Sequence, residues 1–144
     1  MLNKAFRNIF LFLIGGGAYI TIEMVWRAIM NSPPTHYAMF IIGGLAFILI
    51  GGVNEWISWD MAFWKQCLFG TVFVLIIELL SGYVLNVKLG LHIWDYSHLP
   101  LNILGQVCPQ FAAAWYLLAG FGIVLDDWLR YLLFGEEFPH YKLI

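Results

Sequence analysis

The chain has 144 residues, of which 62% are apolar and 11% are charged, and its mean hydropathy is +0.81. Soluble domains carry about 25% charged residues, so this composition excludes a protein whose whole surface faces water. The net charge of −2 provides no basic field for binding nucleic acid. We therefore expect a single all-α domain in the cell membrane, with the lipid bilayer as its main partner.

The amino-terminal stretch could be a signal peptide or a retained helix. Lys4 and Arg7 precede an apolar core, and a run of small residues imitates a cleavage site. The apolar run nevertheless continues to about residue 30, which is long enough to cross a bilayer. We therefore expect a retained first span over residues 8–30, ended by Pro33 and Pro34, because prolines cannot continue the helical hydrogen-bond pattern.

Three further apolar runs approach the ~20 residues that a helix needs to cross the bilayer. We place them at residues 36–53, 66–87 and 109–125, the last beginning at Pro109, which suits a first helical turn. Between the second and third spans, several tryptophans indicate a short interfacial helix or turn. The predicted fold is a four-transmembrane-helix bundle, and we expect the amphipathic tail, residues 126–144, to lie on the membrane surface.

Positive charges predict the orientation of these spans, because lysine and arginine are more frequent in cytoplasmic loops. The outer side would carry Arg27 and Lys88. The inner side would carry the other five positive residues, which are Lys4, Arg7, Lys65, Arg130 and Lys142. Both termini are therefore expected in the cytoplasm, and the connection between the third and fourth spans is expected outside.

A faint internal repeat relates the two halves of the chain. The second and fourth spans each end in an acidic residue followed by tryptophan, at residues 54–56 (NEW) and 126–128 (DDW). A duplicated helical hairpin would produce this pattern. Chance would produce it too, because matched short peptides are common.

Two glutamates lie inside predicted spans, where a carboxylate costs about 2.5–3.5 kcal/mol near the helix centre. Glu23 has a natural partner in Arg27, four residues later on the same helix face. Glu78 has no partner at helical spacing, so its partner should come from another helix or from the outer connection. Either the acids bind a cation or a proton in an outward-facing polar cavity, or they and Arg27 form a polar cluster that only stabilises helix packing.

The outer connection, residues 91–108, is the longest polar interruption between apolar runs. Its second half is too apolar for an exposed loop and too short to span, which favours a re-entrant or interfacial segment. Asp95, Asn102 and His92 are then candidates to meet Glu78 at the mouth of the cavity. The alternative is an outer lid held by a turn at Asp95, without contact to a ligand.

No sequence pattern indicates a metal, a cofactor or a familiar enzyme. His92 and His98 flank Asp95, but this spacing is not an established ligand pattern. The motifs of hydrolases, metalloproteases and nucleotide-binding proteins do not occur. We expect no metal and no cofactor, and a non-enzymatic protein more than an enzyme.

Residues 77–86 (IELLSGYVLN), followed by residues 94–108 (WDYSHLPLNILGQVC), resemble the family of small membrane proteins described as putative ABC-transporter type IV (CmpB-like). The resemblance covers residues 69–118 well and the rest of the chain loosely. It assigns the family's glutamate to Glu78. It assigns the ordered signature that follows to Trp94, Asp95, Tyr96, Ser97, Pro100, Asn102, Ile103, Gly105, Val107 and Cys108. The structural part of this motif comprises Trp94, Tyr96, Ser97, Pro100, Gly105 and Cys108.

Three positions depart from the family pattern. Ile93 stands where a second tryptophan is expected, and Gln106 stands where an arginine is expected. Pro109 follows the cysteine where an apolar residue is usual. The missing arginine puts in doubt any anion-binding role at position 106.

The resemblance implies a permease role, so we expect a transport component for a small solute or a cation. Four spans form a thin wall for a transporter, which favours a homo-oligomer, and other membrane subunits are possible partners. The candidate binding residues are Glu78, Glu23, Arg27, Asp95, Asn102 and His92. Two alternatives stay open, a membrane-embedded enzyme acting on a lipid or lipid-linked substrate and a non-catalytic membrane scaffold subunit.

Overall fold

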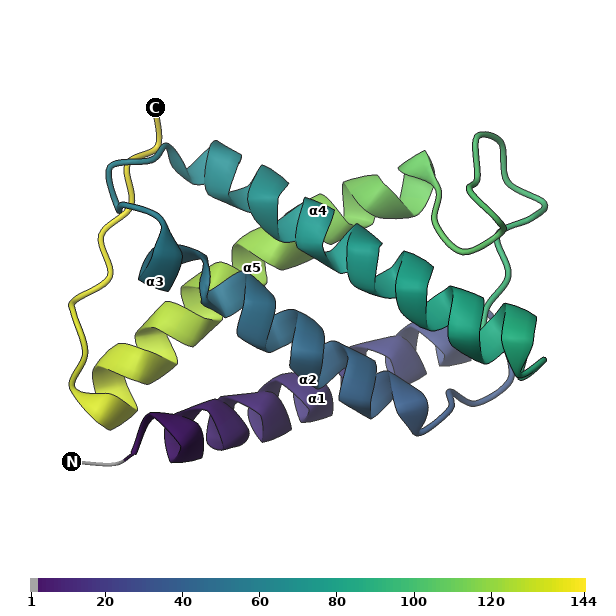
Figure 1. The fold of residues 1–144 in the computed structure, drawn as a ribbon, viewed down its shortest axis with the longest axis horizontal. Coiled ribbons are helices and arrows are strands. Elements are labelled where there is room, and N and C mark those ends of the chain that lie inside the picture. The colour runs from purple at the N-terminus through teal and green to yellow at the C-terminus, as the bar shows by residue number, and fades with distance from the viewer. Residues whose placement is uncertain (1–2) are drawn as a thin grey trace. The chain divides into compact units, whose positions relative to one another are not determined.

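The structure, a computed structural model, describes residues 3–144, and its regular elements are helices joined by loops (Figure 1). Its elements in chain order are α1 (Lys4–Ile29), α2 (Ala38–Gly51), α3 (Val53–Trp56), α4 (Phe63–Gly82), the π-helical turn η1 (Tyr83–Lys88) and α5 (Pro109–Phe134). The described residues form no strand, only an isolated β-bridge between Ile103 and Val107. The all-α prediction is confirmed.

Three helical stretches of the described chain are long and apolar enough to cross a membrane. They are Lys4–Ile29, Ala38–Trp56 and Phe63–Lys88. These stretches agree with the first three predicted spans and with the membrane class. Helix α5 is not among them, and its last turns carry Asp126, Asp127 and Arg130, so a fourth span stays a prediction.

The chain forms two compact units, Met1–Ile48 and Leu49–Ile144. In the first unit, glycines allow α1 and α2 to approach closely. A Cβ atom added at Gly15 would lie 2.2 Å from Cβ of Phe47, and one added at Gly43 would lie 2.5 Å from Cβ of Tyr19. Small residues at such crossings let helix backbones pack against each other in a membrane.

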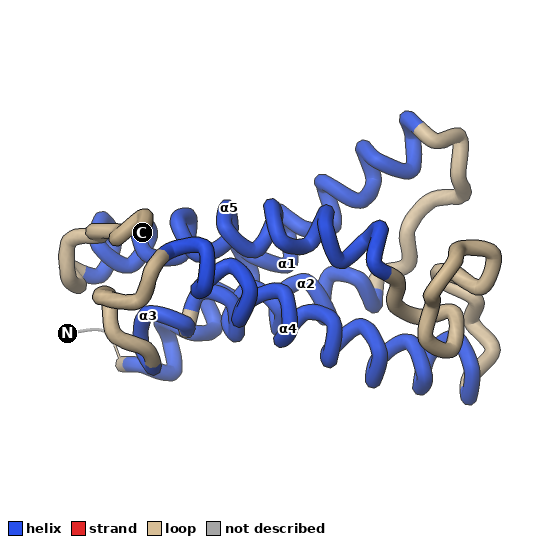
Figure 2. The backbone as a smooth tube through the Cα atoms, turned by 90° about the horizontal axis from the view of Figure 1, so that it is seen from above, coloured by secondary structure: helices blue, strands red, loops and turns tan. Residues whose placement is uncertain are grey.

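In the second unit, α4 and α5 pack against each other, and the η1–α5 loop (residues 89–108) joins them at one end (Figure 2). Glycines again mark the contact between these helices. A Cβ atom added at Gly70 would lie 3.0 Å from Cβ of Ala119, and one added at Gly120 would lie 3.1 Å from Sγ of Cys67. The face of α4 that is buried includes Glu78.

The last helix extends beyond the predicted fourth span. We place that span at residues 109–125, with the helix then leaving the membrane, and α5 runs on to Phe134. Asp126 and Arg130 form an ion pair at helical spacing, so these charges fit within the helix and do not end it. Gly135, with a left-handed φ of 67°, then ends α5. The chain after it returns to the start of α4, where the Phe63 N–H donates to the Lys142 carbonyl at 2.7 Å.

Candidate functional site

The η1–α5 loop is held together by its own side chains. Asp95 Oδ1 accepts a hydrogen bond from the Ser97 N–H at 2.8 Å. Asn102 closes the following turn, since its Oδ1 accepts from the Gly105 N–H at 2.8 Å and its Nδ2 donates to the Leu99 carbonyl at 2.8 Å. The Asp95 and Asn102 side chains thus make their hydrogen bonds within the loop and not with Glu78.

The charge of Asp95 strengthens its turn. The backbone and side chain of Ser97 donate hydrogen bonds to this carboxylate and hold its pKa below the ordinary value, and the nearby His98 and His92 act in the same direction. Asp95 is exposed, so it is ionised and solvated at neutral pH. His92 itself has a left-handed backbone with φ of 47° at the start of the loop.

The remaining motif residues also shape the loop. Gly105 has a positive φ of 68°, and the Tyr96 ring stacks on Phe111 of α5 at 4.4 Å between centroids. Pro100 lies in the turn between Ser97 and Asn102. The buried Cys108 occupies the position before the first residue of α5.

Two buried amide side chains attach this loop to the end of α4 and η1. Asn86 Nδ2 donates to Gln106 Oε1 at 2.8 Å, and Asn86 Oδ1 accepts from the Ile93 N–H at 2.7 Å. The Trp94 indole donates to the Gln106 carbonyl at 3.1 Å. A Cβ atom added at Gly82 would lie 2.3 Å from Gln106 Oε1, so the glutamine covers the helix surface directly.

Sequence analysis did not assign a role to either amide. It marked Gln106 only as a departure from the family pattern, and it did not single out Asn86. One signal was available: Gly82 and Asn86 follow Glu78 at intervals of four, which places all three on one helix face. A glycine between two polar residues on an apolar helix can indicate that a polar segment packs there.

Glu78 lies one turn before the glycine that Gln106 covers. It is 4% exposed, and it shares the buried face of α4 with Thr71, Val74 and Gly82. The structure therefore places the carboxylate below the attachment point of the loop, on the face that packs inside the second unit.

The other predicted ionisable pair lies in the first unit. Arg27 Nε lies 2.9 Å from Glu23 Oε1, as the spacing of four residues predicts. Arg27 also donates to the Pro33 carbonyl at 3.2 Å, so it bonds to the chain that follows α1. The Glu23 carboxylate thus has a cationic partner within the same helix.

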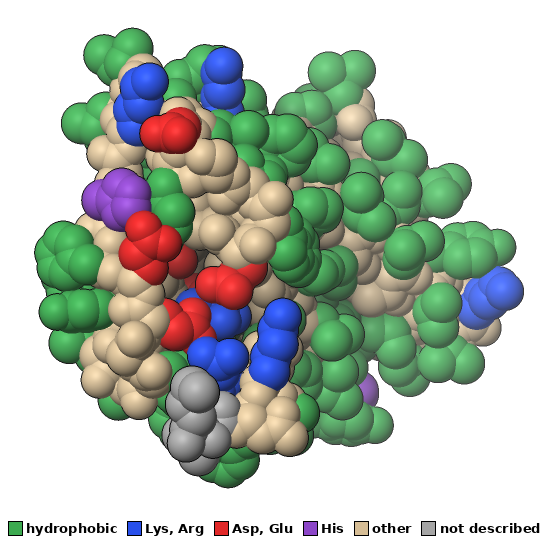
Figure 3. Space-filling view, turned by 60° about the vertical axis from the view of Figure 1, so that its left-hand side comes forward, with side chains coloured by type: hydrophobic (Ala, Val, Ile, Leu, Met, Phe, Trp, Pro, Cys, Tyr) green, Lys and Arg blue, Asp and Glu red, His purple; other side chains and the backbone are tan. Residues whose placement is uncertain are grey.

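A second polar centre, the α5 polar cluster, consists of Asn54, Asp126, Asp127, Arg130 and Tyr141. Asp127 Oδ2 accepts hydrogen bonds from Asn54 Nδ2 at 2.7 Å and from the Tyr141 hydroxyl at 3.0 Å. Arg130 Nε pairs with Asp126 Oδ2. Acidic side chains gather on the face of the molecule seen in Figure 3.

This cluster is buried inside the second unit, and the membrane-surface position of the tail stays a prediction. Asp126 is 0% exposed, Asp127 4% and Arg130 6%. Burial is possible because Asn54 and Tyr141 supply hydrogen bonds from segments distant in sequence. The similar peptides at residues 54–56 and 126–128 were the available signal, since Asn54 of the first bonds to Asp127 of the second.

Burial shifts the protonation equilibria of Asp126, Asp127 and Tyr141, which lie beyond residue 125 and outside the three membrane-crossing stretches. Loss of solvation raises the pKa of Asp126 to about 6, although Arg130 opposes this shift. It raises the pKa of Asp127 to about 7, although the hydrogen bonds from Asn54 and Tyr141 oppose it. Burial and the neighbouring Asp127 also raise the pKa of Tyr141.

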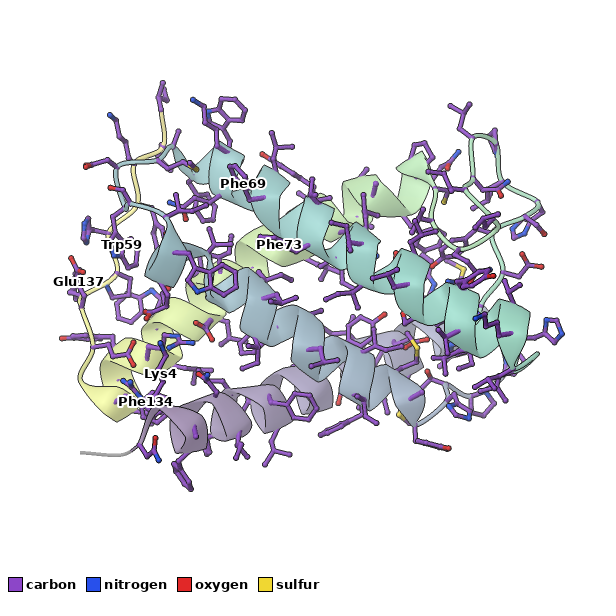
Figure 4. The ribbon with its side chains drawn as sticks, in the orientation of Figure 1. Lys4, Trp59, Phe69, Phe73, Phe134 and Glu137 are labelled. Carbon is purple, nitrogen blue, oxygen red and sulfur yellow. The ribbon has the colours of Figure 1, made fainter. Side chains whose placement is uncertain are left out.

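Close packing surrounds the cluster. A Cβ atom added at Gly51 would lie 2.1 Å from Cγ of Asp126, so only glycine fits there. The tail is anchored by Trp59, whose ring stacks on His140 at 4.8 Å and contacts Tyr141 at 5.7 Å between centroids (Figure 4). The Tyr141 hydroxyl is thereby held against Asp127.

A family model described as putative ABC-transporter type IV matches residues 9–133. The matched region includes Glu78, the η1–α5 loop and the α5 residues of the polar cluster. No curated protein and no solved structure matches the chain significantly.

Proposed function

Since the chain belongs to the putative ABC-transporter type IV family, we propose that it is a membrane-embedded permease component that moves a small solute or a cation. Its helices support this role, because three stretches are long and apolar enough to cross a bilayer. In the proposal, residues 109–125 of α5 form a fourth span. The positive charges then place both termini in the cytoplasm and the η1–α5 loop outside.

The observation that carries the proposal is the burial of Glu78. This carboxylate is 4% exposed in the apolar stretch Phe63–Lys88, where an acid is expensive and usually marks a functional site. We propose that Glu78 is the group that binds the transported cation or cationic solute. Glu23 is not included, because Arg27 neutralises it.

The η1–α5 loop would serve as the outer cover of this site. Gln106 rests on Gly82, one turn above Glu78, and its hydrogen bond to Asn86 holds it there. Loosening this attachment would uncover the helix face that leads to the carboxylate. The cover is thus separate from the binding group, and the two can be tested by separate substitutions.

We further propose that the protein works as a homo-oligomer. Helix α1 exposes large apolar side chains along its whole length, among them Phe6, Leu13 and Ile29. A bilayer can cover such a surface, but four spans enclose little room for a pathway. A second copy would supply the rest of the wall.

Purified protein in liposomes that enclose a fluorescent pH indicator provides the test. Gradients of sodium, potassium or a small amine would be imposed one at a time, and the flux and internal pH would be recorded. We expect the wild type to exceed empty liposomes for at least one of them. Glu78→Gln should abolish this flux while the protein still folds, because glutamine keeps the shape and removes the charge.

Glu137→Gln is the matched control, since the Glu137 side chain is 64% exposed in the tail. It should transport like the wild type. Flux through Glu78→Gln at the wild-type rate would refute the assignment of the site. Absence of flux for every cation tested would refute an autonomous permease.

A further inference from the structure

The α5 polar cluster contains two buried acceptor oxygens that have no hydrogen-bond partner within residues 3–144. They are Asp126 Oδ1 and Asn54 Oδ1. Asp126 is 0% exposed and Asn54 9%, so protein surrounds both side chains. The Asn54 side chain points into the cluster, since its Nδ2 donates to Asp127. An unsatisfied buried polar atom is energetically costly, so two such acceptors in one cluster indicate a site suited to take up a hydrogen-bond donor.

The hydrogen bonds within the cluster go to other oxygens than these two. Tyr141 and Asn54 both donate to Oδ2 of Asp127, and Arg130 bonds Oδ2 of Asp126. Arg130 also lies 3.6 Å from Glu136, through Nη1 and Oε2. The Arg130 guanidinium thus contacts Asp126 and Glu136, while the neighbouring carboxylate of Asp127 is buried beside Asp126 in the chain. Two adjacent buried carboxylates in one low-dielectric site resist simultaneous ionisation.

The packing favours the smallest ligand. Gly51 is so close that an added Cβ atom would lie 2.1 Å from Asp126 Cγ, which leaves no room for a hydrated cation between Gly51 and this carboxylate. Within the described chain, no group of three or more His, Cys, Asp or Glu residues is placed to hold a metal ion. The charge of Arg130 would also repel a metal. A proton needs no space and turns an acceptor oxygen into a donor.

We propose that Asp126 and Asp127 together form a proton-binding site that holds one exchangeable proton, with Asn54 as a neutral hydrogen-bonding partner. A carboxylate takes the proton from solvent and becomes a neutral carboxylic acid, and it returns the proton to solvent on release. The site lies outside the Glu78 region and does not depend on the proposed transport role.

The charged and titratable groups around the pair support this assignment. Glu55 of α3 and Glu136 of the tail disfavour a second negative charge at Asp126, whereas Arg130 favours it. Tyr141 from the tail donates to Asp127. With burial included, the pKa values of about 6 and about 7 allow the pair to exchange a proton at physiological pH. Because the two acids are adjacent, they titrate as a pair.

Aspartate labelled with ¹³C at the side-chain carboxyl tests the proposal in the intact protein. The chain has only four aspartates, Asp60, Asp95, Asp126 and Asp127, so the carbon NMR spectrum contains few carboxyl signals. The protein in lipid nanodiscs would be titrated from about pH 8 to about pH 5. We expect at least one signal from the α5 pair to move from the ionised to the protonated position near neutral pH.

The carboxyl signals can be assigned even if the buried aspartates do not tolerate substitution. Asp126→Asn and Asp127→Asn assign the pair directly, and Asp60→Asn with Asp95→Asn assigns it by elimination if the former do not fold. The proposal is overturned if both α5 carboxyls stay ionised over the whole range. It is also overturned if sodium, added at constant pH in place of choline, moves the signals, because a metal cation would then occupy the site.

Discussion

The two ends of the α4–α5 pair are built from opposite kinds of polar interaction. At the loop end, the neutral amides of Asn86 and Gln106 bond to each other and to the backbone. At the other end, two adjacent acidic side chains, Asp126 and Asp127, are buried, and Asp126 Oδ1 has no hydrogen-bond partner within residues 3–144. Satisfied neutral bonds hold a segment in place at low electrostatic cost, whereas a buried carboxylate pair depends on protonation. The comparison distinguishes a structural attachment from a site that can change its charge.

The largest loss of stability should follow from a substitution next to Asp126. Gly51→Ala places a methyl group where Asp126 Cγ would lie 2.1 Å away, so helix α2 or α5 must shift. We expect a loss of about 1–3 kcal/mol in the free energy of unfolding, the usual range for overpacking. Thermal unfolding in detergent, followed by circular dichroism, measures it.

Gly17→Ala is the matched control for this substitution. A Cβ atom added there meets no atom within 4 Å, and the residue is also helical. Alanine should stabilise that helix by about 0.5–1 kcal/mol, because glycine loses more conformational entropy on folding. Equal behaviour of the two variants would show that Asp126 does not pack on Gly51.

A smaller loss of stability is expected at the loop end, where the neutral amides of Asn86 and Gln106 lie. Gln106→Ala leaves Asn86 Nδ2 without its acceptor, and because water can reach this amide when the loop loosens, we expect a loss of about 0.5–1.5 kcal/mol in the free energy of unfolding. The loop should loosen and expose Cys108, which is 4% accessible in the wild type. Maleimide labelling, located by peptide mass spectrometry, would therefore become faster at Cys108.

Gln110→Ala is the control here, since Gln110 is exposed in the first turn of α5. In this variant, Cys108 should react with maleimide as slowly as in the wild type. If both variants label at the same rate, Gln106 does not attach the loop.

The smallest effect concerns the exposed Asp95 turn. The pKa of Asp95 is lowered in the folded protein, so its ionised form stabilises the turn above the unfolded value of about 3.9. This contribution is lost as the pH falls through the still lower folded value. Asp95→Asn should therefore increase amide hydrogen exchange at Ser97 at neutral pH. The difference from the wild type should shrink in acid, and a constant difference across pH would contradict the assignment.

The sequence predicted those features that depend on local spacing or on composition. The membrane class follows from too few charges to cover a surface. The Glu23–Arg27 pair follows from the interval of four residues in one helix, and the Asp95 turn from a side chain that bonds two residues ahead. Each of these interactions is made within one short segment. No folding of distant segments is needed to form it.

The tertiary structure alone decided the contacts between segments that are distant in the sequence. Asn54 reaches Asp127, and Gln106 reaches Asn86, only because α4 and α5 pack side by side and the chain after α5 returns to the start of α4. The residue type alone does not distinguish a buried aspartate from an exposed one. Whether Asp126 and Asp127 face solvent or protein depends on which donors packing brings to them, and that is a property of the whole unit.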